Sequence, residues 1–462
     1  MRHQIQHTIA GICRKGHGVT TEPELPVEER LYQLLQHLGI ERAHFATGAP
    51  FDVGRLAATH PSTIASLWSV GAEGIEAACR SLGSRIAVLY GDQGPAGLDA
   101  RRMLGAEPGV PRVVLSDYFH AIWSDVAADR TDEVVSGMLD FLSSPGSEAS
   151  VRDPLSERAG EVAGITYRIR GAGPPLVLLP LGLAPSQWEP LLPRLSERFS
   201  TVTLRGPKVG TAAFLESRAT TGMYADLLRA LIGDARLEPG EVVLDVGCGT
   251  GVLDRQLAGL TGRANPIVGL DVNRYLLDEA AALARSEGLE GIIEFREGDA
   301  EALPFADASF NVTLSVTVME EVNADRMLAE MVRVTRPGGR VGVVVRAVDM
   351  PRWVNAKLPA ALLAKVQAPE ASSGIGGGVA ERGCGDASLY GRFVDAGLSN
   401  VRMAPRMATA SGALLEVEAD VRVPSMLDAD EQQQWRDARA LAEAAGTFFI
   451  AAPFHCAVGT KP

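Results

Sequence analysis

Acidic residues and closely spaced glycines in the last part of the chain have the pattern of a ligand-binding turn. The segment VVLDVGCGTG (242–251) reads as a buried strand that contains Asp245 and runs into glycines at alternate positions, Gly247, Gly249 and Gly251. Glycine allows a positive φ and lets a ligand lie against bare backbone, where the first N–H groups of the following helix are free to bond it. We therefore expect a ligand at the end of this strand.

A second acid, Asp271, ends the next expected strand, 20 residues beyond Gly251. A carboxylate at that place can accept both hydroxyls of a ribose, as it does in dinucleotide sites. The dinucleotide fingerprint G-x-G-x-x-G/A, however, would place Val252 where a small residue is needed, and Asp245 would face the phosphates. The pattern therefore favours a cationic ligand that carries no phosphate.

Four segments occur in a characteristic order: LDVGCGTG (244–251), GLD (269–271), EGDAEALPF (297–305) and RVTRPGGRVGVVV (333–345). With them, the chain from about residue 220 onward resembles the class I S-adenosylmethionine-dependent methyltransferases, most closely the small-molecule branch of ubiquinone/menaquinone-biosynthesis type. The resemblance implies an α/β fold with a doubly wound, Rossmann-like sheet. It also implies S-adenosylmethionine as cofactor and a small metabolite as methyl acceptor. The apolar stretch in the insertion 348–386 favours a hydrophobic acceptor.

The same resemblance implies how the cofactor is bound. The glycine loop would cradle the methionine part, Asp271 would bind the ribose diol and Val272 would pack on the adenine. Asp299 would accept a hydrogen bond from the adenine amine, and Ser315 would line the cavity near the methyl group. The cofactor-binding set is Asp245, Gly247, Cys248, Gly249, Thr250, Gly251, Asp271, Val272, Asp299, Ala300 and Ser315.

Catalytic residues are harder to choose, because displacement at a sulfonium methyl depends mainly on positioning and desolvation and needs no obligatory general base. His455 in the last expected strand, and Glu320 and Glu321 after the fourth strand, are weak candidates. A structural histidine and a solvated helix start are the alternatives. The insertion 348–386, with an apolar stretch and a glycine-rich tract, predicts a lid over the site or, alternatively, a surface loop.

Length and composition limit the other classes of function. A chain of 462 residues fits about three domains or two large ones, and a net charge of −13 argues against a nucleic-acid or anionic-membrane surface. The 5 cysteines form no C-x-x-C pair, so neither a disulfide framework nor a metal site is expected. No apolar run approaches the roughly 20 residues of a membrane span. We expect a soluble, cytoplasmic protein that acts on a small molecule, with a homodimer left open.

The N-terminal half resembles an α/β-hydrolase whose two parts are in swapped order. Residues 31–144 resemble the later half of that fold, and residues 164–204 resemble the first half up to its fourth strand. Together they would close one permuted sheet, with the polar stretch 143–162 as linker. We therefore predict an α/β-hydrolase-like domain over 1–210 and a methyltransferase domain over 211–462.

The catalytic triad of such a hydrolase is incomplete in this chain. The nucleophile elbow requires G-x-S-x-G, and an ungapped match places Thr47 at the serine position. The acid position falls on Gly94, although Asp92 is near, and only His120 matches the histidine. We predict a non-catalytic pseudo-hydrolase domain kept for binding or assembly, the alternative being a weak hydrolase that uses Thr47 or Ser69. For the whole chain, the alternatives to a methyltransferase are a cofactor-binding scaffold and a bifunctional hydrolase–methyltransferase.

Overall fold

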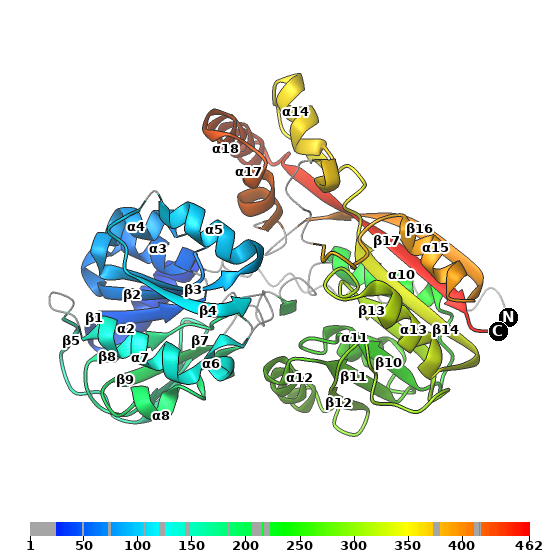
Figure 1. Cartoon of the computed structure of the whole chain (residues 1–462), viewed down its shortest axis with the longest axis horizontal. Coiled ribbons are helices and arrows are strands. Elements are labelled where there is room, and N and C mark those ends of the chain that lie inside the picture. Colours follow the sequence, from blue (N-terminus) through cyan, green and yellow to red (C-terminus); the bar gives the residue numbers. More distant parts are fainter. Residues whose placement is uncertain are drawn as a thin grey trace, which may run out of the picture.

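The computed structural model describes residues 25–48, 50–72, 75–105, 107–119, 125–143, 148–182, 184–205, 215–216, 222–372, 379–410, 415 and 417–462. Two α/β units follow one another along the described chain, each built around its own sheet (Figure 1). The predicted boundary at 210/211 and the predicted hydrolase histidine, His120, both lie outside the described residues.

The sheet of the first unit combines the two segments that the sequence suggested belong together. Its strands are β1 (Ile40–Thr47), β2 (Ile64–Val70), β3 (Ile86–Gln93), β4 (Arg112–Phe119), β5 (Ser150–Val151), β6 (Arg158–Val162), β7 (Ile165–Arg170), β8 (Pro175–Leu178) and β9 (Ser200–Arg205). They lie in the order β4-β3-β2-β1-β8-β9-β7-β6, and β5 pairs with β1. Because β1 and β8 are parallel neighbours, with His44 opposite Leu176, the later segment completes the sheet that the earlier one begins.

Helices cover both faces of this sheet. They are α2 (Val27–Leu38), α3 (Pro50–Thr59), α4 (Glu76–Leu82), α5 (Gly94–Gly105), α6 (Val126–Asp129), α7 (Thr131–Leu142) and α8 (Leu192–Leu195). Successive residues of β1 enter opposite cores: Phe45 packs with α2 to α5, and Ala46 packs with α6 to α8. Between β8 and β9 the chain forms two short helical turns, Pro185–Trp188 and Leu192–Leu195, rather than one helix, because prolines at 190 and 193 remove helical N–H donors.

The predicted linker 143–162 is partly wrong, because it contains two strands. β6 forms an antiparallel hairpin with β7, in which Arg158 lies opposite Ile169, and β5 pairs with the start of β1. β6 lies at the edge of the sheet, and most of its side chains are exposed. An edge strand that is exposed on both faces needs no alternation of apolar and polar side chains. The polar composition of β6 is therefore typical of a loop.

The second unit has the doubly wound sheet that was expected. Its strands are β10 (Val243–Val246), β11 (Ile267–Asp271), β12 (Ile293–Glu297), β13 (Phe310–Val316), β14 (Thr335–Arg346), β15 (Trp353–Asn355), β16 (Ser399–Thr409) and β17 (Phe449–Thr460). The order is β12-β11-β10-β13-β14-β17-β15, with β16 also paired to β17. The strands from β12 to β14 in this sheet order are parallel to one another, and β17 is antiparallel to β14. The chain order reverses beside β10, which is where such sheets bind ligands.

Five helices sandwich this sheet: α10 (Gly222–Asp234), α11 (Val252–Leu260), α12 (Arg274–Ser286), α13 (Ala324–Val334) and α15 (Ser388–Asp395). α10 to α12 pack on one face, and α13 and α15 pack on the other. The sequence Pro337-Gly338-Gly339 is typical of a break between helix and strand, but β14 already begins at Thr335 and passes through it. The pairing with β13 shifts register there, so the glycines form a bulge within the strand.

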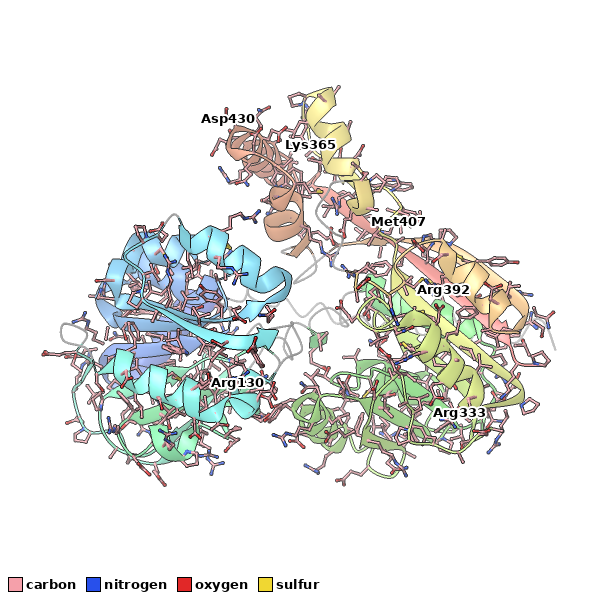
Figure 2. The ribbon with its side chains drawn as sticks, in the orientation of Figure 1. Arg130, Arg333, Lys365, Arg392, Met407 and Asp430 are labelled. Atoms are coloured by element: carbon pink, nitrogen blue, oxygen red, sulfur yellow. The ribbon has the colours of Figure 1, made fainter. Side chains whose placement is uncertain are left out.

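A helical cap stands beside the open end of the second sheet. It consists of α14 (Ala360–Gln367), α17 (Val423–Ser425) and α18 (Ala429–Ala444), whose core is centred on Trp435. Lys365 of α14 reaches across to pair with Glu431 of α18, next to Asp430 (Figure 2). In the described part of the chain, no helix combines the length and the hydropathy that a membrane crossing requires.

Candidate active site

The glycine loop connects β10 to α11 in a conformation that depends on glycine. Gly247 and Gly251 have φ of +78° and +71°. A Cβ on Gly247 would lie 2.2 Å from the Val318 side chain, and one on Gly251 would lie 2.7 Å from the Phe295 ring. No L-side chain fits at either place, so the backbone of the loop stays bare on the side where a ligand can approach.

The two strand-end acids meet at this loop because β10 and β11 are parallel neighbours. The Asp271 carboxylate accepts hydrogen bonds from the Gly249 N–H (2.9 Å) and the Asn273 N–H (2.8 Å). Asp245 is only 3% exposed, and its Oδ1 has no hydrogen-bond partner. Burial, reinforced by the neighbouring carboxyls Asp254 and Asp271, raises the pKa of Asp245 well above its usual range. A buried acid with a free oxygen suits a ligand that brings a cationic hydrogen-bond donor.

The residues predicted to contact adenine follow β11 and β12. Val272 is 66% exposed, which is unusual for valine and leaves an apolar surface for a flat ring. Asp299 is exposed and accepts a hydrogen bond from the Glu301 N–H (2.8 Å), while Ala300 is buried beside it. These positions surround the edge of the sheet next to Asp271, as a nucleoside site requires.

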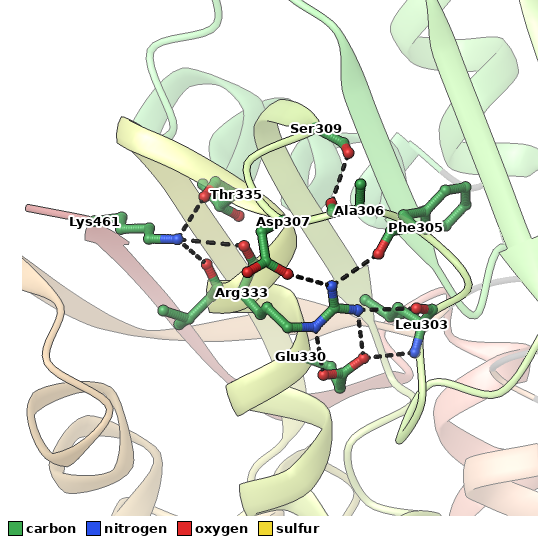
Figure 3. A network of polar contacts seen from close by, with 10 residues as sticks. Leu303, Phe305, Ala306, Asp307, Ser309, Glu330, Arg333, Thr335 and Lys461 are labelled. Carbon is green, nitrogen blue, oxygen red and sulfur yellow. Dashed lines mark hydrogen bonds and ion pairs between the residues drawn. The ribbon is translucent and has the colours of Figure 1, made fainter.

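A cationic side chain of α13 orders the loop that carries Asp299. Arg333 donates to the Leu303 and Phe305 carbonyls at 2.9 and 2.8 Å and to the Asp307 carboxylate at 2.8 Å (Figure 3). Glu330 holds the same guanidinium and also accepts the Leu303 N–H at 2.7 Å. This network fixes the loop from 303 to 307 against α13. Asp299, which precedes this loop, is therefore held in a defined position.

Three of the predicted side chains point into the protein. The Ser315 hydroxyl donates to the Val246 carbonyl (2.7 Å) and is fully buried, so it ties β13 to β10. The Cys248 thiol and the Thr250 side chain are also buried. At these three positions any contact with a ligand would come from the backbone.

Sequence reasoning missed Asp254, in the first turn of α11. This carboxyl is 1% exposed, and neither of its oxygens has a hydrogen-bond partner. Burial raises the pKa of Asp254 to about 7. The available signal was an acid among the apolar positions Leu253 and Leu257, which pack into the core.

The weak catalytic candidates differ from one another. Glu320 is 1% exposed, and its Oε1 accepts the Arg346 N–H (2.7 Å), while Oε2 has no partner. Burial raises the pKa of Glu320 to about 7, so this carboxylate has the proton affinity of a general base at neutral pH. Glu321 is half-buried and lies 3.8 Å from the Arg346 guanidinium.

His455 has a visible structural role. Its Nε2 lies 2.7 Å from Asp349 Oδ1, and the second oxygen of Asp349 accepts the Ala387 N–H (3.0 Å). The pair therefore attaches the insertion that follows β14 to the last strand, although Nδ1 of the buried ring has no partner. The geometry gives the structural interpretation more support than the catalytic one.

A small cavity of about 20 Å³ lies between the end of β14 and the helical cap. Its wall combines apolar side chains with buried ion pairs, among them Arg352–Glu370 at 2.8 Å. The lining residues are Arg346, Ala347, Val348, Met350, Arg352, Glu370, Glu418, Arg422, Ala452, Pro453 and Phe454. The insertion thus contributes both apolar and charged groups, whereas the sequence suggested a purely apolar cover.

At the end of β1, the position expected for a nucleophile elbow is closed by neighbouring backbone. A Cβ on Gly48 would lie 0.9 Å from the Leu181 carbonyl oxygen, so no side chain can occupy that turn. Thr47 is 1% exposed, and the Ser69 hydroxyl on the next strand donates to the Gly71 carbonyl (2.8 Å). Asp92 accepts a hydrogen bond from the Gln93 side chain (3.0 Å). Within the described residues, this arrangement presents no exposed hydroxyl at the elbow.

A known protein family matches part of the second unit. The family described as "Methyltransferase domain" matches residues 243–339. Demethylmenaquinone methyltransferase of Lactobacillus johnsonii is 37% identical over 110 residues, which is 24% of this chain and 45% of that protein. Methyltransferase GfsG of Streptomyces halstedii is 42% identical over 105 residues, or 22% of this chain and 37% of that protein. The chain thus spans less than half the length of these relatives.

Among solved structures, the YcgJ protein of Bacillus subtilis matches over 51% of this chain and 98% of its own, with a TM-score of 0.35 and 17% identity. The glycine loop and the two strand-end acids, Asp245 and Asp271, all lie within the matched family segment. Residues 243–339 therefore form a class I S-adenosylmethionine-dependent methyltransferase domain, and its cofactor is S-adenosylmethionine.

Proposed function

We propose that the whole protein transfers a methyl group from S-adenosylmethionine to a small, largely hydrophobic metabolite. The observation that carries this proposal is the buried, incompletely bonded Asp245 beside a bare glycine loop, with Asp271 on the adjacent strand. This arrangement suits a cationic amino acid group and a ribose and repels phosphate. The cofactor, when bound, supplies a methyl group already activated by the positive charge on sulfur.

The residues of the chain would then position the two reactants and exclude water. Asp245 and the loop backbone would hold the amino acid part, Asp271 the ribose, and Val272 with Asp299 the adenine. The insertion that follows β14 and the helical cap would cover the acceptor and shield it from water. Glu320 would accept a proton from the attacking atom where that atom carries one.

We also propose that the first unit is an α/β-hydrolase-like domain without hydrolase activity. Counted from β6, its strands run 1-2-4-3-5-6-7-8 across the sheet, and only the second is antiparallel to the others. This is the order of an α/β-hydrolase sheet whose first four strands have moved behind the last four. The closed turn at Gly48 supports a role in binding or assembly. A cytoplasmic location and a homodimer remain predictions.

Calorimetry tests the proposed function directly. S-adenosylmethionine and S-adenosylhomocysteine should each bind, and NAD should not, since Asp245 faces the place of its phosphates. Small molecules that co-purify with the protein, identified by mass spectrometry, would then provide acceptors for a methyl-transfer assay. Tight NAD binding without any adenosylhomocysteine signal would overturn the proposal. A scaffold that merely binds cofactor would show binding and no transfer to any co-purified compound.

A further inference from the structure

Asp254 places a second buried carboxyl under the glycine loop, and the described residues do not neutralise it. Neither oxygen has a hydrogen-bond partner, and the side chain is 1% exposed. The adjacent Arg255 directs its guanidinium elsewhere: its Nε donates to Glu287 (2.9 Å), and a terminal nitrogen donates to the Thr250 carbonyl (2.5 Å). Among the described residues, Asp254 therefore has no ion pair that would explain its burial.

The Asp254 carboxyl lies close to that of Asp245. In the parallel pairing of β10 with β11, Asp245 is directly opposite Gly269, and a Cβ on Gly269 would lie 2.7 Å from Asp254 Oδ2. Val243, two residues before Asp245 on the same strand face, packs in one core with Leu257 of α11. Both carboxyls therefore point into the same closed space between β10 and the first turn of α11.

Two carboxylates without a counter-ion in such a space cannot both be ionised, so they must retain a proton between them. We propose that Asp245 and Asp254 share a proton beneath the glycine loop, and that binding of the cofactor's ammonium group expels this proton to solvent. Asp254 is then a positioning residue that acts through Asp245. The inference rests on the proposed function, because it requires a cationic amino acid group at the loop.

The other charged or titratable groups around Asp254 are less suited to this exchange. Burial raises the pKa of Asp271, at the end of β11, but two backbone N–H groups that donate to this carboxylate offset part of the rise. The Cys248 thiol, from the loop itself, stays protonated because burial and the three acids raise its pKa well above its usual range. Within the described residues, no group of three or more His, Cys, Asp or Glu side chains is placed to hold a metal ion. A proton is therefore the available counter-charge.

Isothermal titration calorimetry with S-adenosylhomocysteine tests the linkage, since this ligand carries the ammonium group without the sulfonium charge. The titration is run from about pH 6 to 8.5, above the sequence pI of 5.2, in two buffers with different ionisation enthalpies. The unsubstituted protein should release about one proton per ligand near pH 6, and its Kd should weaken by up to tenfold per pH unit below about pH 7. The Asp254→Asn variant should release less than half as many protons per bound ligand, and its Kd should depend less steeply on pH.

Asp278→Asn is the matched control, because it removes the same charge from an exposed position on the neighbouring helix α12. It should keep the proton release of the unsubstituted protein. Asp254→Ser repeats the test with a smaller side chain if the asparagine variant does not fold. Ligand binding without proton release, or release that Asp254→Asn and Asp254→Ser leave unchanged, overturns this inference alone. Failure of the unsubstituted protein to bind the ligand at any pH overturns the proposed function as well.

Discussion

Replacing Glu320 by glutamine should stabilise the second unit at neutral and higher pH. Burial raises the pKa of this carboxyl from 4.5 to about 7, so the folded protein holds the proton over a range where the unfolded chain has lost it. The stability that the protonated side chain provides is therefore present below about pH 4.5 and is lost as the pH rises to about 7. The difference between 4.5 and about 7, at about 1.4 kcal/mol per pH unit, corresponds to about 3–4 kcal/mol.

Hydrogen exchange of the β13 and β14 amides, read by mass spectrometry, measures this effect without assuming that the whole chain unfolds in one step. Glutamine keeps the size of the side chain, and its carboxamide oxygen can still accept the Arg346 N–H. Relative to the unsubstituted protein, protection in Glu320→Gln should rise by up to roughly a hundredfold between about pH 5 and pH 8. Glu321→Gln, beside the same arginine but half-buried, is the control. If the ratio of amide protection between Glu320→Gln and the unsubstituted protein is the same at both pH values, Glu320 does not hold a proton in the folded protein.

Three further substitutions and a comparison of two fragments test other parts of the molecule. Asp271→Ala should weaken S-adenosylhomocysteine binding by roughly 1.5–3 kcal/mol in calorimetry, the effect of lost hydrogen bonds to a charged group, and an unchanged Kd would remove this acid from the site. Gly48→Ser should destabilise the first unit by more than about 4 kcal/mol, because the new Cβ would overlap a backbone carbonyl, and an unaltered thermal melt would contradict that. Thr47→Ala should leave the hydrolysis of activated esters at background, whereas a hundredfold loss would reveal a nucleophile. A fragment of residues 31–144 should aggregate, while residues 1–210 should fold cooperatively; a sharp melt of the short fragment would refute the shared sheet.

The elements that bind the cofactor could be predicted because their signals are local. A buried strand followed by alternating glycines defines the β10–α11 turn within ten residues, and Asp271 ends a strand of similar composition. The pairing of distant segments in the first sheet was also accessible, since each segment carries its own strand–helix alternation. The polar strand β6 was not predicted, because an edge strand without a buried face shows no alternation of apolar and polar residues in its sequence.

The burial of individual acids depends on contacts that sequence spacing does not contain. Asp254 is enclosed because Gly269 on another strand leaves room for its carboxyl. Glu320 is enclosed because the insertion returns over it, where the Ala380 N–H donates to its carbonyl (2.7 Å) and Gly383 packs against the same oxygen. At the sequence level both residues look like solvated positions near helix starts, and only tertiary packing gives them unusual proton affinities.

The strand order of the first unit also affects how the protein is synthesised. β1 emerges from the ribosome early, yet the parallel neighbour that covers one of its edges, β8, lies more than a hundred residues later in the chain. At elongation rates of roughly 5–20 residues per second, that edge of β1 stays unpaired for on the order of ten seconds. The long separation in sequence between these paired strands therefore creates an interval during translation in which the edge of β1 is open to intermolecular strand pairing.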